Sequence, residues 1–153
     1  MRNVNVTRAL CVCMPIFFGG ALYTLFGSVT LWVFDWYAYL GLTDFVIGVR
    51  GIFADVRPLL PGWVLYSLPD GLWTYAYTSL MVNIWHTSEK SNIKLFWLLS
   101  GVLLAIGTEF GQLFGLLVGT FDVLDIYFYI MGFLLALLSS SLVKMEVVEF
   151  CAN

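Results

Sequence analysis

The chain has 153 residues, of which 61% are hydrophobic and 11% charged, and its formal net charge at pH 7 is −3. Soluble domains carry about a quarter charged residues, so this composition excludes an ordinary soluble globular domain and indicates an integral membrane protein. The few lysines and arginines are scattered along the chain, which argues against a nucleic-acid partner. We expect residues 1–153 to form a single all-α membrane domain.

Four apolar stretches predict transmembrane helices, because about 20 mainly apolar residues cross a bilayer core. The predicted spans cover residues 9–34, 69–85, 95–118 and 121–144. The first span follows a basic N-terminus, as a signal-peptide core does. Its apolar run is longer than such a core, which favours a retained helix over cleavage.

A short amphipathic helix is predicted between the first and second spans, at residues 44–57. Apolar side chains recur there at helical spacing, which is typical of a helix lying in the membrane interface. Arg50 and Arg57 lie seven residues apart on one side of it. They are expected either to hold this segment at the headgroup level or to bind lipid phosphates.

Asp70 falls in the first turn of the second span, where a negative charge suits the helix dipole. The alternative is that Asp70 joins a polar site, because Trp73 and Tyr77 share its helical face. The polar segment 86–94 then forms a loop, and its histidine, His86, is interpreted as solvated and without a catalytic role.

The third span carries two distinct patterns. Gly107, Gly111 and Gly115 repeat every four residues, which is typical of a face that another helix approaches closely. Glu109 and Gln112 lie together on a different face. Within residues 95–118, Glu109 is expected in mid-helix, roughly 13 Å from the outer end, too deep for a capping role.

A two- or three-residue turn at Gly119 and Thr120 is predicted to lead into the fourth span, with Thr120 as the N-cap. Asp122 either stabilises this helix start or joins a site, whereas the deeper Asp125 is harder to explain by capping. Four residues share one helical face, namely Asp122, Asp125, Tyr129 and Gly132.

The basic residues predict the orientation. With the N-terminus inside, the inner segments hold Arg2, Arg8, Lys90, Lys94 and Lys144, and the outer segments hold Arg50 and Arg57. The positive-inside rule therefore favours both termini in the cytoplasm. Asp70, Asp122 and Asp125 then lie at the outer ends of their helices, and the third and fourth spans place their polar residues in one outward-opening cavity. The carboxylates cannot all stay ionised in a low dielectric, and Glu109 is expected to be protonated first.

The stretch Gly107–Gly132 (GTEFGQLFGLLVGTFDVLDIYFYIMG) resembles the VanZ-like family of small bacterial membrane proteins, which is named after a teicoplanin-resistance factor. The resemblance rests on E-x-x-Q, followed by T-F-D-x-x-D and a later glycine. It implies a shared motif of Glu109, Gln112, Asp122, Asp125 and Gly132. The chain departs from the family where Gly119 replaces a common arginine and Tyr129 a common asparagine. The missing arginine weakens any function that needs an anion at this turn, unless Arg50 or Arg57 replaces it.

These patterns favour a VanZ-like protein of the bacterial inner membrane, multi-pass, with an acidic pocket facing outward. Its expected partner is an envelope lipid or an amphiphilic or cationic ligand such as a lipoglycopeptide. The expected ligand-binding residues are Asp70, Glu109, Gln112, Thr120, Asp122, Asp125, Tyr129 and Arg57.

Three alternatives remain open. One is an enzyme acting on a lipid-linked substrate, with Glu109 and Asp125 as acid and base. Another is a small subunit of a membrane complex or a helix-mediated oligomer, docked through the glycines of the third span. The third is proton-coupled transport. No cofactor or metal is predicted, and the cysteines are expected to be free thiols, namely Cys11, Cys13 and Cys151.

Overall fold

The computed structural model describes residues 2–29, 31–85 and 92–152, with side chains described between residues 6 and 140 of these ranges. The predictions for His86 and for the side chain of Cys151 lie outside the described residues. Within them every element of regular secondary structure is helical. The elements are α1 (Arg2–Phe26), α2 (Trp32–Tyr39), α3 (Thr43–Ile52), a 3-10 turn η1 (Arg57–Leu59), α4 (Gly62–Leu65), α5 (Ser67–Ile84), α6 (Asn92–Leu113) and α7 (Val123–Ala152).

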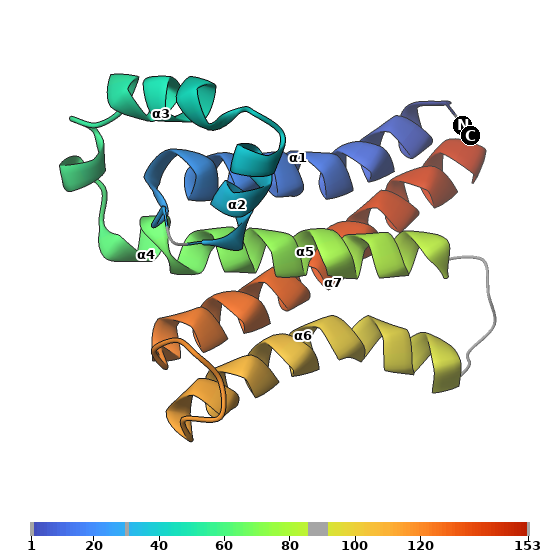
Figure 1. Ribbon diagram of the computed structural model, residues 1–153. Helices are drawn as coiled ribbons and strands as arrows, with labels where there is room; N and C mark the ends of the chain where they lie inside the picture. Colours follow the sequence, from blue (N-terminus) through green and yellow to red (C-terminus); the bar gives the residue numbers. More distant parts are fainter. Residues whose placement is uncertain (1, 30, 86–91, 153) are drawn as a thin grey trace.

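Helix α5 lies at the centre of the bundle and packs against α1, α6 and α7 (Figure 1). The four long helices alternate in direction along the chain, and the short helices α2 and α3 fold over the end of α1. The start of α5 and the loop between α6 and α7 therefore lie at the same end of the bundle. This arrangement brings the acidic residues of three helices to that end.

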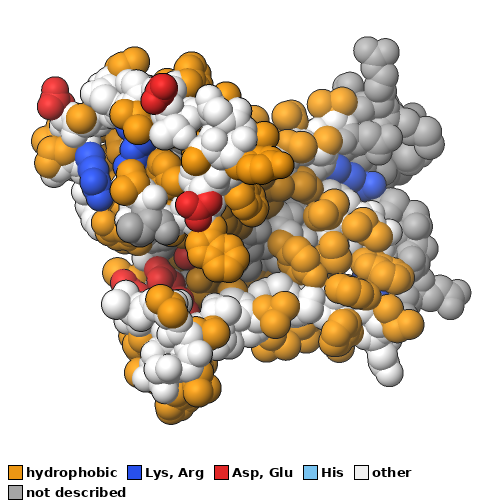
Figure 2. All heavy atoms as spheres, in the orientation of Figure 1, with side chains coloured by type: hydrophobic (Ala, Val, Ile, Leu, Met, Phe, Trp, Pro, Cys, Tyr) orange, Lys and Arg blue, Asp and Glu red, His pale blue; other side chains and the backbone are white. Residues whose placement is uncertain are grey.

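Three helices are long and apolar enough to cross a membrane, and they run over Val6–Phe26, Asn92–Leu113 and Val123–Ser140. Large apolar side chains stay exposed along them, and Figure 2 shows an extended hydrophobic surface over the helical stems. These features confirm the prediction of a helical membrane protein that crosses the bilayer several times.

The second predicted span corresponds to α5, which does not reach the same hydropathy. Its hydroxyl side chains are buried instead of facing outward, namely Ser67, Thr74, Thr78 and Ser79. A helix that is surrounded by three others can carry such groups, because its neighbours and not lipid cover them. The three apolar helices α1, α6 and α7 thus surround the more polar helix α5.

The first span ends at Phe26 and not at residue 34 as predicted. The Arg50 guanidinium lies at this helix end, where it donates hydrogen bonds to the carbonyl oxygens of Thr24 (2.5 Å) and Gly27 (2.8 Å). A cation at a helix C-terminus satisfies free carbonyls and complements the helix dipole. The aromatic residues that follow form the separate helix α2.

The third span ends at Leu113 and not at residue 118. Gly115 adopts a left-handed conformation with φ +68°, which glycine accommodates without steric cost. The Gly115 N–H then bonds the Gln112 carbonyl (3.0 Å) and the Leu116 N–H bonds the Gly111 carbonyl (2.8 Å). This pair of bonds is the Schellman motif that ends many helices. The predicted two- or three-residue turn is consequently a longer loop over residues 114–122.

The predicted glycine stripe is not a continuous face, because Gly115 lies beyond the end of α6. A Cβ at Gly107 would meet no atom of the described residues within 4 Å, so none of the described helices packs closely there. The close approach occurs instead between Gly71 on α5 and Gly132 on α7. A Cβ at Gly71 would lie 2.9 Å from the Phe128 carbonyl oxygen, and a Cβ at Gly132 would overlap the Gly71 carbonyl oxygen.

Candidate functional site

Asp70 lies at the centre of a polar cluster formed by three helices. Its Oδ1 accepts a hydrogen bond from the Tyr23 hydroxyl of α1 at 2.7 Å, and its Oδ2 accepts one from the Tyr129 hydroxyl of α7 at 3.2 Å. Tyr129 is 8% exposed, so this contact is largely shielded from solvent. Of the two interpretations of Asp70, the geometry therefore favours membership of a polar site.

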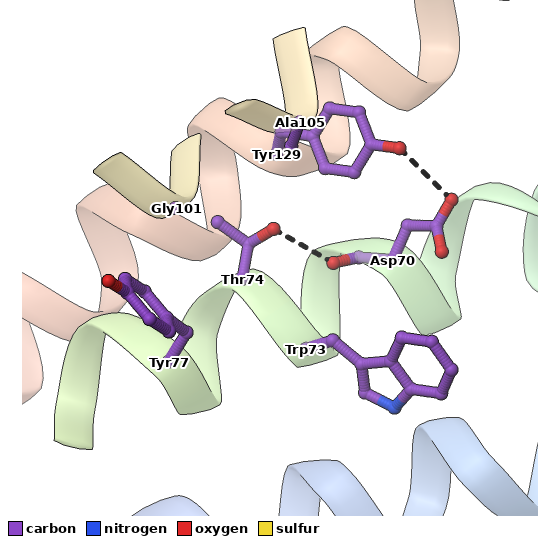
Figure 3. A pocket seen from close by; sticks show the side chains of 7 residues that line it. All are labelled: Asp70, Trp73, Thr74, Tyr77, Gly101, Ala105 and Tyr129. Atoms are coloured by element: carbon purple, nitrogen blue, oxygen red, sulfur yellow. Dashed lines mark hydrogen bonds between the residues drawn. The ribbon is translucent and has the colours of Figure 1, made fainter. Parts of the chain in front are cut away.

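A cavity of about 270 Å³ opens beside Asp70, between α5, α6 and α7 (Figure 3). Its lining consists of Asp70, Trp73, Thr74, Tyr77, Gly101, Ala105 and Tyr129. Trp73 and Tyr77 thus lie on the same side of α5 as Asp70, as their spacing predicts. The lining combines one carboxylate and three hydroxyls with aromatic and small apolar surfaces.

Hydroxyl groups join α5 to α6 at the other end of this cavity. The Tyr77 hydroxyl lies 2.7 Å from Ser100 Oγ, and it also donates to the Trp97 carbonyl oxygen at 3.0 Å. A Cβ at Gly101 would overlap the Tyr77 ring, so glycine is needed for this approach. These contacts define the wall of the cavity opposite Asp70.

Glu109 is buried, with 3% of its surface exposed, and its Oε2 accepts a hydrogen bond from the Asp122 N–H at 3.1 Å. The prediction that Glu109 lies in mid-helix, too deep for capping, is wrong. Because α6 ends at Leu113, Glu109 lies about one turn from the helix end and faces the start of α7. Its carboxylate thus ties the start of α7 to the last turns of α6.

Asp122 is the N-cap of α7, because its Oδ1 accepts a hydrogen bond from the Leu124 N–H at 2.8 Å. This bond supports the alternative that Asp122 stabilises the start of the helix. The prediction that Thr120 is the N-cap is wrong. Helix α7 begins at Val123, and Thr120 is an exposed loop residue. The helix starts later than expected because the loop is longer than expected.

Asp125 lies one turn inside α7 and is half-buried. Its Oδ1 is buried and has no hydrogen-bond partner among the described residues. Ser67 of α5 lies beside this carboxylate, is only 1% exposed, and its Oγ is likewise without a bond of good geometry. Asp125 also acts electrostatically on Asp70, so the two carboxylates face the same region.

The other candidate residues, Gln112, Arg57 and Arg50, lie on three different elements, namely α6, η1 and α3. The Gln112 side chain packs on Gly119, because a Cβ added at Gly119 would lie 2.6 Å from the Gln112 Cδ. Gly119 adopts φ +142°, which favours glycine. Arg57 is exposed in η1, and among the described residues it makes no ion pair with the acidic cluster. Arg50 is held by the carbonyls at the end of α1. Burial and the neighbouring charge of Arg57 lower the pKa of its guanidinium, although arginine stays a cation. Neither arginine makes an ion pair with an acidic residue in the described part of the chain.

The sequence interpretation missed Tyr23, which contributes the shorter hydrogen bond to Asp70. Its ring also packs on Trp73, with ring centroids 5.0 Å apart. A signal was present, since a tyrosine hydroxyl within an apolar helix needs a hydrogen-bond partner when it is buried. Its position on α1 did not indicate which helix supplied that partner.

Comparisons with known proteins add one similarity. The chain is 30% identical over 63 residues to the polyprenyl-phosphate transporter of Vibrio cholerae serotype O1, a stretch covering 37% of this chain and 20% of that protein. The chain thus matches only about a fifth of the length of this curated relative. No family model and no solved structure matches. The similarity and the apolar helices together indicate a multi-pass membrane protein.

Proposed function

We propose that the chain binds the head of an amphiphilic ligand in the cavity beside Asp70. The observation that carries this proposal is a carboxylate that accepts two tyrosine hydroxyls at the wall of an open, partly aromatic cavity. Pockets for small amphiphiles combine a largely apolar lining with a few fixed polar groups. Here the tail contacts aromatic and small residues, while the head contacts the carboxylate.

The surroundings of Asp70 favour a cationic or hydrogen-bond-donating head. Among the described residues, Tyr23 and Tyr129 donate hydrogen bonds to it and Asp125 and Glu109 act on it electrostatically, and none of these four groups is a cation. An ionised carboxylate in a low dielectric is costly without a counter-charge. A positively charged head would supply that charge, whereas an anionic head would be repelled. The Vibrio cholerae relative is named as a transporter of a polyprenyl phosphate. Its polyprenyl tail supports a lipid-like ligand for this chain, whereas its anionic phosphate head does not match the head that Asp70 favours.

The proposal places the protein in the bacterial inner membrane, with α5 as a fourth span, both termini in the cytoplasm and the cavity opening outward. We also propose that the protein is a member of the VanZ-like family and acts in the cell envelope. Support comes from the motif residues, since the Glu109 carboxylate binds the Asp122 N–H and thereby builds the loop beside the site. An envelope lipid or a lipoglycopeptide has the amphiphilic chemistry required.

A further part of the proposal concerns a second copy or a membrane partner. Gly107 on α6 has open space in front of it and lies among exposed apolar side chains, for example Leu103 and Leu104. A helix from another subunit could approach closely there. Gly111 cannot contribute equally, because Leu117 of the same chain already covers it.

Binding of matched amphiphiles tests the ligand proposal. Three single-chain compounds with the same tail, carrying an amine, a sugar or a phosphate head, are titrated into protein in nanodiscs while tryptophan fluorescence is recorded. We expect the amine compound to bind tightest and its affinity to fall at least tenfold in Asp70→Asn, since hydrogen bonds to charged groups contribute about 1.5–3 kcal/mol. Asp44→Asn, an exposed carboxylate of α3, is the matched control. Equal amine binding by Asp70→Asn and the control would refute the proposal.

A further inference from the structure

The acidic cluster has a second feature that ligand binding alone does not explain, namely a chain of polar groups leading away from the cavity. Asp70 is faced by Tyr23 from α1, by Tyr129 and Asp125 from α7, and by Glu109 from α6. Helix α4 presents no titratable group to it. All of these neighbours are acids or phenols, so an empty cavity leaves the charge of Asp70 uncompensated. A proton is the simplest way to neutralise it.

Asp125 lies on α7 between Tyr129, which donates a hydrogen bond to the half-buried Asp70, and the exposed Asp122 at the start of the helix. Asp125 and Tyr129 are separated by one helical turn, and Asp122, one turn earlier, is exposed. Ser67 lies beside Asp125, and its hydroxyl is able both to donate and to accept a hydrogen bond. Neither the buried Asp125 Oδ1 nor the buried Ser67 Oγ makes a hydrogen bond of good geometry to a described residue, so both oxygens can take part in proton exchange.

We propose that Asp70 is a proton-binding group that exchanges its proton with the aqueous phase through Asp125 and Ser67, so that a cationic ligand and a proton compete for the cavity. In this step the O–H bond of Asp70 breaks and Ser67 Oγ accepts its proton, while the Ser67 O–H proton passes to the Asp125 carboxylate, where a new O–H bond forms. Asp125 in turn releases a proton at the Asp122 end. The positive charge of the ligand replaces the proton at Asp70, and no other covalent bond changes.

A metal ion is a poorer occupant than a proton. Within the described part of the chain, no three acidic, histidine or cysteine side chains converge closely enough to hold a metal. Calcium takes six to eight oxygen ligands and magnesium requires octahedral coordination. A proton needs a single carboxylate, and the pathway needs only neighbouring groups that donate and accept in turn.

Infrared difference spectroscopy tests the proton site without any ligand. Wild-type protein in nanodiscs is cycled between acidic and alkaline buffer, and the C=O stretch of protonated carboxyl groups is recorded. We expect a band that is lost in Asp70→Asn and kept in Asp44→Asn. If Asp70→Asn does not fold, Tyr129→Phe serves, because loss of one donor should shift the frequency of the Asp70 band. A spectrum unchanged in every folded variant would overturn the proposal.

The pathway is tested by the rate at which this band appears after a rapid pH jump. Asp125→Asn keeps the shape of the side chain but removes its proton-accepting carboxylate, so the Asp70 band should form more slowly than in wild type and Asp44→Asn. Its final amplitude should be unchanged, which separates a pathway role from a structural one. An unchanged rate in Asp125→Asn would refute the route through this residue.

The coupling to ligand rests on the proposed function and has a separate readout. When the amine amphiphile saturates the protein in weakly buffered solution at the pH where Asp70 is protonated, about one proton should be released per ligand. None should be released by Asp70→Asn. Binding without proton release would overturn the competition and leave the ligand proposal standing. A proton band without amphiphile binding would refute the ligand proposal and leave the proton site.

Discussion

Glu109 offers the sharpest test of how the acidic loop is built, because it accepts a hydrogen bond from a backbone N–H and is 3% exposed. Glu109→Gln keeps the size of the side chain and an oxygen acceptor but removes the negative charge. Glu109→Leu keeps the volume approximately but removes the acceptor. Comparison of the two variants separates the hydrogen bond from the charge.

The expected magnitudes follow from the type of hydrogen bond. A hydrogen bond to a charged group stabilises by about 1.5–3 kcal/mol and a neutral one by about 0.5–1.5 kcal/mol, so Glu109→Gln should lower the free energy of unfolding by about 1 kcal/mol. Glu109→Leu leaves the Asp122 N–H without its acceptor, and the loss should be about 1–3 kcal/mol. The Leu variant should therefore be less stable than the Gln variant.

Reversible unfolding in mixed detergent micelles, followed by circular dichroism, measures these differences. Amphiphile binding at Asp70 should survive in Glu109→Gln, because Glu109 holds the loop and does not line the cavity. Two results would refute this reasoning: equal stability of the Leu variant and wild type, or loss of binding in a Gln variant that is fully folded. The second result would assign to Glu109 the charge or proton chemistry that its capping geometry does not require.

Three other predictions follow from packing and capping. Gly132→Ala should destabilise the protein by about 1–3 kcal/mol, because its Cβ would overlap the α5 backbone, whereas Gly107→Ala, with open space and higher helix propensity, should be neutral or stabilising in the same unfolding assay. Arg50→Ala should cost about 1 kcal/mol by removing the cation that caps α1, and faster proteolysis between α1 and α3 should report the loss, with exposed Arg57→Ala as the unchanged control. Tyr23→Phe should weaken binding of the amine amphiphile less than Asp70→Asn does, because one donor to the carboxylate is lost while the charge remains; an equal loss would show that the hydroxyl itself contacts the ligand.

Several features of the site follow from local sequence. Composition and apolar run length indicate a helical membrane protein, and helical periodicity places Trp73 and Tyr77 on the side of Asp70. The alternative that Asp122 stabilises the start of a helix is also local, since a capping bond joins residues two positions apart. Such features depend on neighbours within one or two turns, which a single sequence displays directly.

Other features depend on which helices are neighbours, and only the tertiary structure decides them. Tyr23 lies 47 positions before Asp70, and no spacing rule connects them. Helix α5 carries its hydroxyls at the centre because three apolar helices surround it, which its own hydropathy does not reveal. The observed role of Glu109 differs from the predicted one because α6 ends early at the left-handed Gly115, and the loop that follows returns to the Glu109 carboxylate. The sequence alone thus determined the helices and their faces, whereas packing determined the partner of each carboxylate, because such contacts join residues far apart along the chain.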